Sequence, residues 1–427
     1  MPGITFTTKG ALDKSALREA NERLVLNTIR QNPAISRADI VRATGLAASS
    51  VTYIVGRLSR NSLILEEETD GQDQVGRRPT ALRLRPDARM AIGVEIVQPD
   101  SRISLADFNG DIVRTKTVRW HANHDVFLGR VHSAIQGFVE PLGTERLLGV
   151  GVGLPGTIDR TTGRVIAAEN FNWMGLDAGL ALRQDLPVPF FYENSAKLAA
   201  LSEMWSSERQ GKPLRDFVFV MGRGGLGTGI VVNGQLYQGA HSAGAEFGHT
   251  MLYADGRSCT CGNTGCWEQY ASDIALCRLY RELKEAETKR TLKDGALEPE
   301  AILQSARKGD PLARQAVEET ARCLGLGLVN LVWALDPEAV ILGDWMAESW
   351  DLLQETVWRV VRSRIAGYYL SGLKIGPSIN SQDAILLGAV TLVLSNFFSS
   401  FDNGKTSKRT NSTRMQPSGW HPAAAAR

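Results

Sequence analysis

Short helical patterns fill the first part of the chain, and buried strand patterns dominate the rest. Before Pro86, apolar residues recur three or four positions apart, as on one face of a helix. After it come short apolar runs separated by helical stretches, which is the pattern of an α/β fold. These runs are Met90–Ile96, Leu147–Leu154, Phe217–Met221 and Ala339–Leu342. We predict a small helical domain and a larger α/β part, whose roughly 310 residues leave room for two lobes of similar plan.

The front part has the pattern of a helix-turn-helix. Ser36, followed three residues later by Asp39, is a capping-box signal for a helix that ends at Gly45. A further helix follows Leu46, with its apolar positions facing inward and its hydroxyl positions facing outward. The inward residues are Val51, Ile54, Val55 and Leu58, and the outward residues, our candidate DNA contacts, are Ser49, Ser50, Thr52 and Tyr53. A dimerisation or docking module is the alternative for three small helices and a hairpin.

The segment after these helices predicts a wing. Leu63–Leu65 and Ala81–Leu84 are its expected strands, and Gly76-Arg77-Arg78-Pro79 closes the tip between them. A pair of arginines held between a glycine and a proline is thin, extended and cationic. Such a segment suits a narrow, strongly negative minor groove. Arg77 and Arg78 are therefore also predicted to contact DNA.

Composition indicates a globular protein with its positive charge at the front. The 427 residues are 43% hydrophobic and 22% charged, which is too long a chain for one ordinary domain. Residues 1–90 hold 14 basic and 10 acidic side chains, a net charge of +4 against +2 for the whole chain. This modest bias does not by itself indicate nucleic acid. Since no stretch approaches the roughly 18 to 20 uninterrupted apolar residues of a membrane span, and no signal peptide is evident, we expect a cytoplasmic protein without a membrane partner.

A cluster of cysteines suggests a metal. Cys259, Cys261 and Cys266 lie within eight residues of one another, separated by glycines, and His249 precedes them. Three thiols and one imidazole with no spare position describe a closed tetrahedral zinc site, which stabilises structure and does not activate water. We therefore expect one structural zinc ion; chance clustering of buried thiols is the alternative. The remaining cysteines, Cys277 and Cys323, fall in helical patterns and are predicted core residues.

Several separated motifs resemble those of the ROK family, named for repressors, open reading frames and kinases. They are Leu148–Asp159, Gly239, Ala243–His249, Cys266-Trp267-Glu268, Asn330–Gly343 and Leu386–Ala389. The resemblance covers residues 89 to 398. The preceding winged helix-turn-helix, with Gly-Arg-Arg-Pro at its tip, is similar to that of the xylose-repressor and N-acetylglucosamine-repressor branch. The resemblance implies an α/β two-lobed fold of the actin-like ATPase type, shared by sugar kinases and Hsp70, behind an N-terminal winged helix-turn-helix.

The resemblance also implies a sugar in the cleft between the lobes. By motif, the family's sugar contacts correspond to Asn170, Asn194, Glu246, His249 and Glu268. Carboxylates, an amide and an imidazole suit a pyranose, because each of its hydroxyls both donates and accepts hydrogen bonds. Each of these residues alone could equally be a surface or satisfied polar group, so the prediction depends on the set.

This sequence differs from the family's kinases at the positions that bind phosphate and accept the proton. Family kinases have an aspartate general base at the place of Ser195, and their Asp-x-Gly-Gly-Thr loop aligns with Glu95–Pro99. The pair Asp344-Trp345 stands where the family keeps glycine near the adenine. Gly222–Gly229 remains glycine-rich, but a lone glycine-rich loop is weak evidence. We therefore expect no catalytic residue, no ATP and no phosphotransfer; the alternative is an active ATP-dependent sugar kinase with an attached DNA-binding domain.

Together, these expectations indicate a sugar-responsive transcriptional regulator. The resemblance to the family favours a repressor of genes for carbohydrate uptake or catabolism. Its expected partners are a palindromic operator in double-stranded DNA and a sugar or sugar-phosphate effector, and it is expected to be a homodimer or homotetramer. A zinc-stabilised scaffold without a ligand is a third possibility. The predicted domains are a tail at 1–15, a winged helix-turn-helix at 16–88, a sugar-binding domain at 89–398 and a tail at 399–427.

Overall fold

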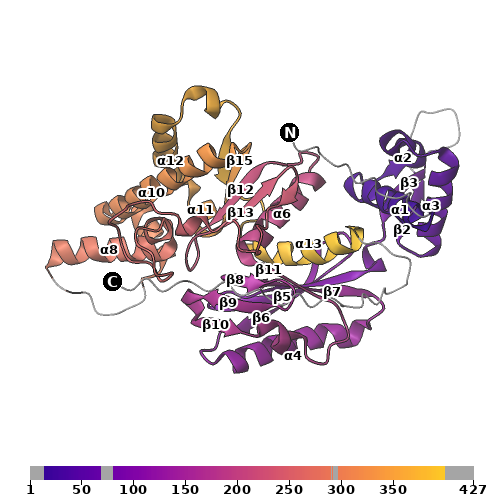
Figure 1. The fold of residues 1–427 in the computed structure, drawn as a ribbon, viewed down its shortest axis with the longest axis horizontal. Helices are drawn as coiled ribbons and strands as arrows, with labels where there is room; N and C mark the ends of the chain where they lie inside the picture. Colours follow the sequence, from indigo (N-terminus) through magenta and orange to yellow (C-terminus); the bar gives the residue numbers. More distant parts are fainter. Residues whose placement is uncertain (1–13, 69–79, 290, 292–296, 400–427) are drawn as a thin grey trace, which may run out of the picture.

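Residues 14–68, 80–289, 291 and 297–399 are described by the computed structural model, and they form a head and two lobes. The head comprises residues 14–84; the N-terminal lobe is built on a sheet that starts at Met90, and the C-terminal lobe on a sheet that starts at Phe217. In Figure 1 the head lies at one end of the long axis, and the two lobes lie one above the other beside it. This is the predicted order of a small helical domain and a larger α/β part.

The head is a three-helix unit with a short antiparallel sheet in the order β1, β3, β2. Its elements are α1 (Lys14–Gln31), β1 (Ile35–Ser36), α2 (Arg37–Thr44), α3 (Ala48–Arg60), β2 (Ile64–Glu68) and β3 (Thr80–Leu84). Strands β2 and β3 are the predicted wing strands, whereas the short edge strand β1 was not predicted. Helix α1 begins at Lys14, slightly ahead of the domain start predicted at residue 16.

Local signals in the head are confirmed. The Ser36 hydroxyl accepts a hydrogen bond from the Asp39 N–H, and the Asp39 carboxylate accepts one from the Ser36 N–H, which completes the capping box. Gly45 ends α2 with a φ of 69°, in the left-handed region that glycine adopts without strain. Ala47 gives α3 no side-chain cap. The predicted inward residues of α3 are all buried: Val51, Ile54, Val55 and Leu58.

The N-terminal lobe is a five-stranded mixed sheet in the order β11, β7, β4, β5, β6. Its first strand, β4, pairs in parallel with β7 and antiparallel with β5, and α4 packs on β5 and β6. The elements are β4 (Met90–Glu95), β5 (Asp100–Ala106), β6 (Ile112–Arg119), α4 (His124–Leu142), β7 (Leu147–Leu154), α5 (Ala178–Arg183) and β11 (Phe190–Asn194). A small antiparallel sheet beside it comprises β8 (Thr157–Asp159), β9 (Arg164–Ala168) and β10 (Trp173–Leu176).

The C-terminal lobe repeats this strand order in a second five-stranded sheet, β16, β15, β12, β13, β14. Again the first strand of the lobe, β12, is central, with a parallel neighbour on one side and an antiparallel neighbour on the other. The repeat confirms two lobes of similar plan. The strands are β12 (Phe217–Met221), β13 (Gly227–Val232), β14 (Gln235–Leu236), β15 (Ala339–Leu342) and β16 (Lys374–Pro377). The helices are α7 (Glu268–Ala271), α8 (Asp273–Thr288), α9 (Pro299–Arg307), α10 (Pro311–Leu335), α11 (Asp344–Glu348) and α12 (Trp350–Arg364).

Helices α6 (Ser195–Arg209) and α13 (Ala384–Ser399) pack against each other between the two sheets. The two helices approach closely at Gly388, where a Cβ atom would lie 2.0 Å from the Leu198 carbonyl oxygen. This contact explains the glycine in the Leu386–Ala389 motif. Among the described residues, only the helix at Ser381–Ser399 is long and apolar enough to cross a membrane, and 61% of it is buried within the fold. Its apolarity is therefore accounted for by the interior it fills.

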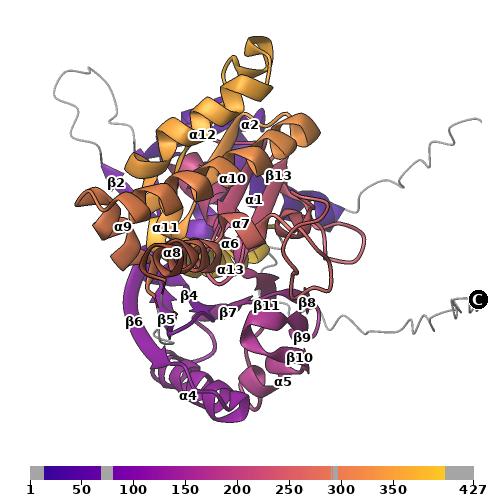
Figure 2. The ribbon, with the colours of Figure 1, turned by 90° about the vertical axis from the view of Figure 1, so that its left-hand side faces the viewer.

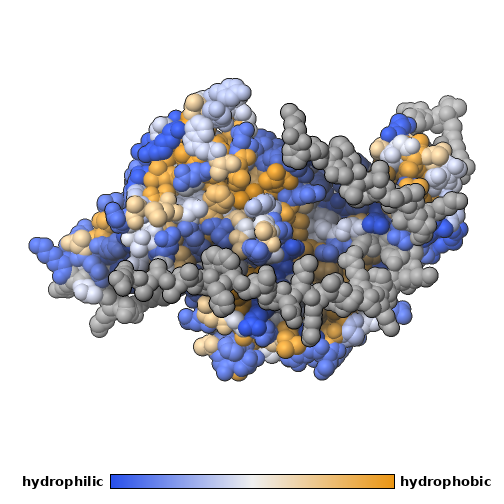
Figure 3. Space-filling view, in the orientation of Figure 1, coloured by the Kyte–Doolittle hydropathy of each residue, from blue (hydrophilic) through white to orange (hydrophobic). Residues whose placement is uncertain are grey.

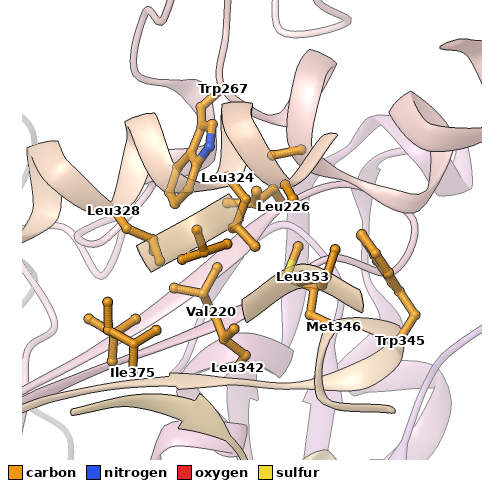
Figure 4. Close-up of a cluster of buried hydrophobic side chains, with 14 of the residues drawn as sticks. Val220, Leu226, Trp267, Leu324, Leu328, Leu342, Trp345, Met346, Leu353 and Ile375 are labelled. Carbon is orange, nitrogen blue, oxygen red and sulfur yellow. The ribbon is translucent and has the colours of Figure 1, made fainter. Parts of the chain in front are cut away.

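Each lobe has its own hydrophobic core. In the C-terminal lobe, Val220 and Leu342 on neighbouring strands share one cluster with Leu324 of α10, Trp345 of α11 and Trp267, which precedes α7 (Figure 4). Seen from the end of the molecule, α10 and α12 lie above the lobe junction and α4 lies below it (Figure 2). On the face drawn in Figure 3, hydrophobic residues gather over the C-terminal lobe, whereas the projecting end of α8 is hydrophilic. The two cores thus frame the junction at which the candidate site lies.

Candidate functional site

A cavity of about 470 Å³ opens between the two lobes. The N-terminal lobe lines it with the turns after β4, β7 and β9, and the C-terminal lobe lines it with the glycine-rich loop between β12 and β13. The structure brings all five residues that were predicted to contact a sugar to this one cavity. They are Asn170, Asn194, Glu246, His249 and Glu268.

The two asparagines already take part in the fold. The Asn170 side-chain amide donates a hydrogen bond to the Gly224 carbonyl, which joins the N-terminal lobe to the glycine-rich loop. Asn194 is the N-cap of α6: its Oδ1 atom accepts from the Ala196 N–H at 2.9 Å and the Lys197 N–H at 3.3 Å. Its Nδ2 atom donates to the Gly156 carbonyl at 2.9 Å. The sequence pattern did not reveal this capping role.

The acidic residue Glu246 lies at the cavity wall, within the electrostatic influence of the buried Lys197. Burial raises the pKa of the Glu246 carboxyl, while His249 and Lys197 act in the opposite direction. Lys197 is 1% exposed, and its ammonium group donates to the Ser242 carbonyl at 2.7 Å, which fixes the loop that leads to Glu246. Its neighbour Glu193 is also fully buried and pairs with Arg160 at 2.6 Å. Sequence reasoning missed these residues, because an ordinary helix pattern gives no sign of a buried charge.

The predicted zinc ligands form a compact cluster. The ligand atoms of His249, Cys259, Cys261 and Cys266 all lie within 4.8 Å of one another. The Cys261 and Cys266 sulfurs are 3.8 Å apart, and the Cys259 sulfur is 3.7 Å from His249 Nδ1. The edge of a tetrahedron with Zn–S bonds of about 2.3 Å measures about 3.8 Å, so the donor set fits a tetrahedral zinc ion. Burial raises the pKa of the Cys259 and Cys266 thiols, and a divalent cation would hold them as thiolates.

Glu268 connects this cluster to the cavity. One carboxylate oxygen, Oε1, accepts a hydrogen bond from the Cys259 thiol at 2.9 Å and lies 3.7 Å from His249 Nδ1. Because the His249 Nδ1 atom faces the cluster, its Nε2 atom is the ring nitrogen left for the cavity. The arrangement positions one carboxylate and one imidazole through a loop that a metal ion would lock.

The other half of the cavity is lined by the chain's own acidic groups. Both carboxylate oxygens of Asp273, at the start of α8, accept from the Gly224 N–H at 3.0 Å. Arg223 lies 3.9 Å from Glu300 and 3.9 Å from Asp344. Burial raises the pKa of Asp273, and it raises the pKa of Asp344 to about 6. The glycine-rich loop therefore already has anions against it.

Other positions of the predicted phosphate machinery have structural partners. The Ser195 hydroxyl donates to the Leu154 carbonyl at 3.2 Å. Glu95 is buried and pairs with Arg102, and the Val97 N–H donates to the Ser101 hydroxyl at 3.1 Å. Trp345 is buried and donates from its indole N–H to the Gly222 carbonyl at 3.1 Å. These contacts show what each residue does in the fold.

The predicted DNA-contacting face of the head is partly as expected. Ser49, Thr52 and Tyr53 on α3 are exposed, whereas Ser50 is half-buried. The Thr52 hydroxyl donates back to the Ala48 carbonyl at 2.9 Å. Arg18 from α1 donates to the Tyr53 hydroxyl and lies 5.0 Å from the centre of its ring, so this arginine adds a positive charge that sequence reasoning missed. The predicted wing-tip residues, Arg77 and Arg78, lie outside the described residues.

The head is joined to the lobes by an aromatic and charged contact. Arg30 of α1 lies 4.0 Å from the centre of the Trp205 ring on α6 and pairs with Glu208 at 3.0 Å. The side-chain amide of Asn27 donates to the Phe398 carbonyl at the end of α13 at 3.2 Å. Helices α6 and α13 are the two helices between the lobes, so the head rests on the elements that would register a change in the angle between them.

Comparison with known proteins agrees with this architecture. The model of the ROK family matches residues 91–396, and a model described as winged helix-turn-helix DNA-binding matches residues 18–64. The chain is 31% identical over 397 residues to a xylose repressor of Caldicellulosiruptor bescii, covering 90% of this chain and 97% of that protein.

Two solved structures share the fold. A ROK family transcriptional regulator, a homologue of the Escherichia coli MLC protein, superposes with a TM-score of 0.75 at 24% identity, covering 90% of this chain and 97% of that one. A ROK family glucokinase from Streptomyces griseus, solved with glucose and AMPPNP, superposes with a TM-score of 0.62 at 29% identity, covering 71% of this chain and 98% of that one. The chain belongs to the ROK family, and it carries a winged helix-turn-helix DNA-binding domain ahead of the two lobes.

Proposed function

We propose that this protein is a sugar-responsive DNA-binding repressor that controls genes of carbohydrate uptake or catabolism. The observation that carries the proposal is the direct contact between the winged head and the two lobes. The cleft between these lobes is lined by five polar side chains that suit the hydroxyl groups of a sugar. The similarity to a protein named xylose repressor, over nearly the full length of both chains, supports the repressor role.

We further propose that the cleft binds a sugar without phosphorylating it. The position of the family's general base is Ser195, and a hydroxyl with a pKa far above neutrality cannot take a proton as a carboxylate does. Its hydrogen bond to the Leu154 carbonyl also gives it a structural use. Because the relatives include glucokinases, an active ATP-dependent sugar kinase with an attached head is the competing function.

A structural zinc ion would hold the site together. His249, Cys259, Cys261 and Cys266 would bind it and leave no open position, so it would supply stability and not an activated water. Because Cys266 lies two residues before Glu268, the ion would also fix the backbone that carries Glu268 at the cavity wall. Asn170, Asn194, Glu246, His249 and Glu268 are the proposed sugar contacts.

The proposed DNA contacts are Ser49, Ser50, Thr52 and Tyr53 on α3, together with Arg77 and Arg78 at the wing tip. Sugar binding can alter DNA affinity only by favouring one arrangement of the lobes over another, and α6 and α13 are the elements through which that arrangement reaches the head. A homodimer or homotetramer on a palindromic operator remains a prediction, as does a cytoplasmic location.

A coupled ATP-consumption assay across common monosaccharides tests the proposal against its rival. The expected result is no sugar-dependent turnover, for the wild-type chain and for Ser195→Asp, because the loop at Glu95–Pro99 is altered as well. Turnover at ordinary kinase rates of roughly 1 to 100 per second would establish the kinase instead.

A further inference from the structure

The charges around the cavity separate two classes of effector, a neutral sugar and a sugar phosphate. Six carboxylates are among the described residues that line it, and these residues include a single arginine and no lysine. They are Glu169, Glu246, Glu268, Asp273, Glu298 and Glu300. A zinc ion held by three thiolates would not offset these charges, because such a site is itself net negative.

Two groups that a phosphate could use are already engaged within the protein. The Gly224 N–H on the glycine-rich loop donates to Asp273, so this backbone donor is not free for a phosphate oxygen. The lone cavity arginine, Arg223, lies between Glu300 and Asp344 at 3.9 Å from each. Its charge is therefore balanced within the protein.

The cavity also disfavours added negative charge. Burial raises the pKa of the Asp273 carboxyl, so a negative charge at this wall of the cavity is less favourable than in water. A phosphate monoester would bring up to two further negative charges into this setting. At short range in a partly buried site, each such like-charge interaction costs on the order of a tenfold loss in affinity or more.

We infer that the effector is a neutral, unphosphorylated sugar, because the half of the cleft beyond the sugar contacts is lined by Asp273, Glu298, Glu300 and the balanced Arg223. This inference rests on the proposed function of the cleft as a sugar site. It assigns these acidic residues a role in specificity: they exclude sugar phosphates and nucleotides while leaving the ring hydroxyls of a neutral sugar to the predicted contacts.

Calorimetry on the full chain with matched ligand pairs tests the inference. The probes are D-glucose with D-glucose 6-phosphate, N-acetyl-D-glucosamine with its 6-phosphate, D-xylose with D-xylose 5-phosphate, and inorganic phosphate. In every pair that binds, we expect the neutral member to bind at least tenfold more tightly, and inorganic phosphate not to bind. A pair in which the phosphorylated member binds as tightly or more tightly would overturn the inference and leave the sugar-sensor function intact. Absence of binding by every sugar would instead refute the proposed function, and the inference with it.

A charge-removal variant tests the cause. Glu298 and Glu300 are exposed at the rim, so the double variant Glu298→Gln, Glu300→Gln is expected to fold. We expect its affinity for the phosphorylated members to rise at least fivefold relative to its affinity for the neutral members. The matched control, Glu140→Gln on the exposed face of α4, should leave the ratio unchanged. An unchanged ratio in the double variant would show that these carboxylates do not set the specificity.

Discussion

The contact of Arg30 with helices α6 and α13 is the clearest place to perturb the coupling between sugar binding in the cleft and DNA binding by the head. The Arg30 side chain is 9% exposed; its guanidinium lies 4.0 Å from the centre of the Trp205 ring and 5.5 Å from that of the Phe398 ring. Its ion pair with Glu208 measures 3.0 Å, and 27% of the glutamate side chain is exposed. One side chain of the head thus meets both α6 and α13.

The expected cost of Arg30→Ala follows from these contacts. A desolvated cation–π contact contributes about 1 to 2 kcal/mol, and a partly exposed ion pair about 0.5 to 1 kcal/mol. The buried methylene stem adds further packing, so we expect the docking of the head to weaken by about 2 to 4 kcal/mol. Glu208 retains access to water, so no large penalty arises from leaving it unpaired.

Hydrogen exchange of α1 and urea unfolding measure this loss. We expect faster exchange along α1 in Arg30→Ala, a lower free energy of unfolding of the head, and a smaller effect of sugar on DNA affinity. Arg83→Ala is the matched control, because Arg83 is 47% exposed on the wing and, among the described residues, its one ion pair is with the exposed Glu67. If Arg30→Ala behaves like this control in both assays, the joint does not couple the head to the lobes.

Three further predictions concern the metal, pH and the wing. Cys261→Ser should release bound zinc and weaken the sugar response. Cys277→Ser should keep the metal, because Cys277 is not part of the cluster and its thiol donates to the Leu297 carbonyl. Metal analysis after dialysis distinguishes the two variants, and full metal content in Cys261→Ser would show that the ligand set is wrong. Burial raises the pKa of Asp344 from 3.8 to about 6, so the ionised form of this carboxyl opposes folding at high pH. Asp344→Asn should therefore add about 1 to 2 kcal/mol to the free energy of unfolding at pH 8, and this gain should shrink as pH falls below 6 and vanish near pH 4. A gain that is independent of pH would refute the assignment. Replacing Arg77 and Arg78 with alanine should weaken DNA binding and reduce the slope of log affinity against log salt by up to about two, and an unchanged slope would exclude both residues from the DNA contact.

Features that depend on neighbouring residues in the sequence were predictable. The capping box at Ser36 and Asp39, the glycine that ends α2 and the inward face of α3 all follow from local spacing, and the structure has them as predicted. The metal cluster was predictable for the same reason, since three of its four ligands lie on one short loop.

Features that depend on distant contacts were not predictable. The hydrogen bonds from the Gly224 N–H to Asp273 cross from one loop to a later helix, and the Arg30 contact with Trp205 joins two domains. Asn194 was singled out as a possible ligand contact, but only the geometry shows that its side chain caps α6. The sequence does not indicate from which backbone N–H a carboxylate will accept a hydrogen bond, because that depends on packing between elements that are remote in the chain.

The effect of sugar on DNA binding in the absence of ATP tests the account most directly. DNA enriched from a random pool by the full chain, labelled for fluorescence anisotropy, would be titrated with protein in the presence of each neutral monosaccharide. We predict that at least one sugar weakens binding tenfold or more, which corresponds to a coupling free energy of about 1.4 kcal/mol or more. DNA affinity that is the same with every sugar, or that changes only while ATP is consumed, would contradict a cleft that senses a sugar without phosphorylating it.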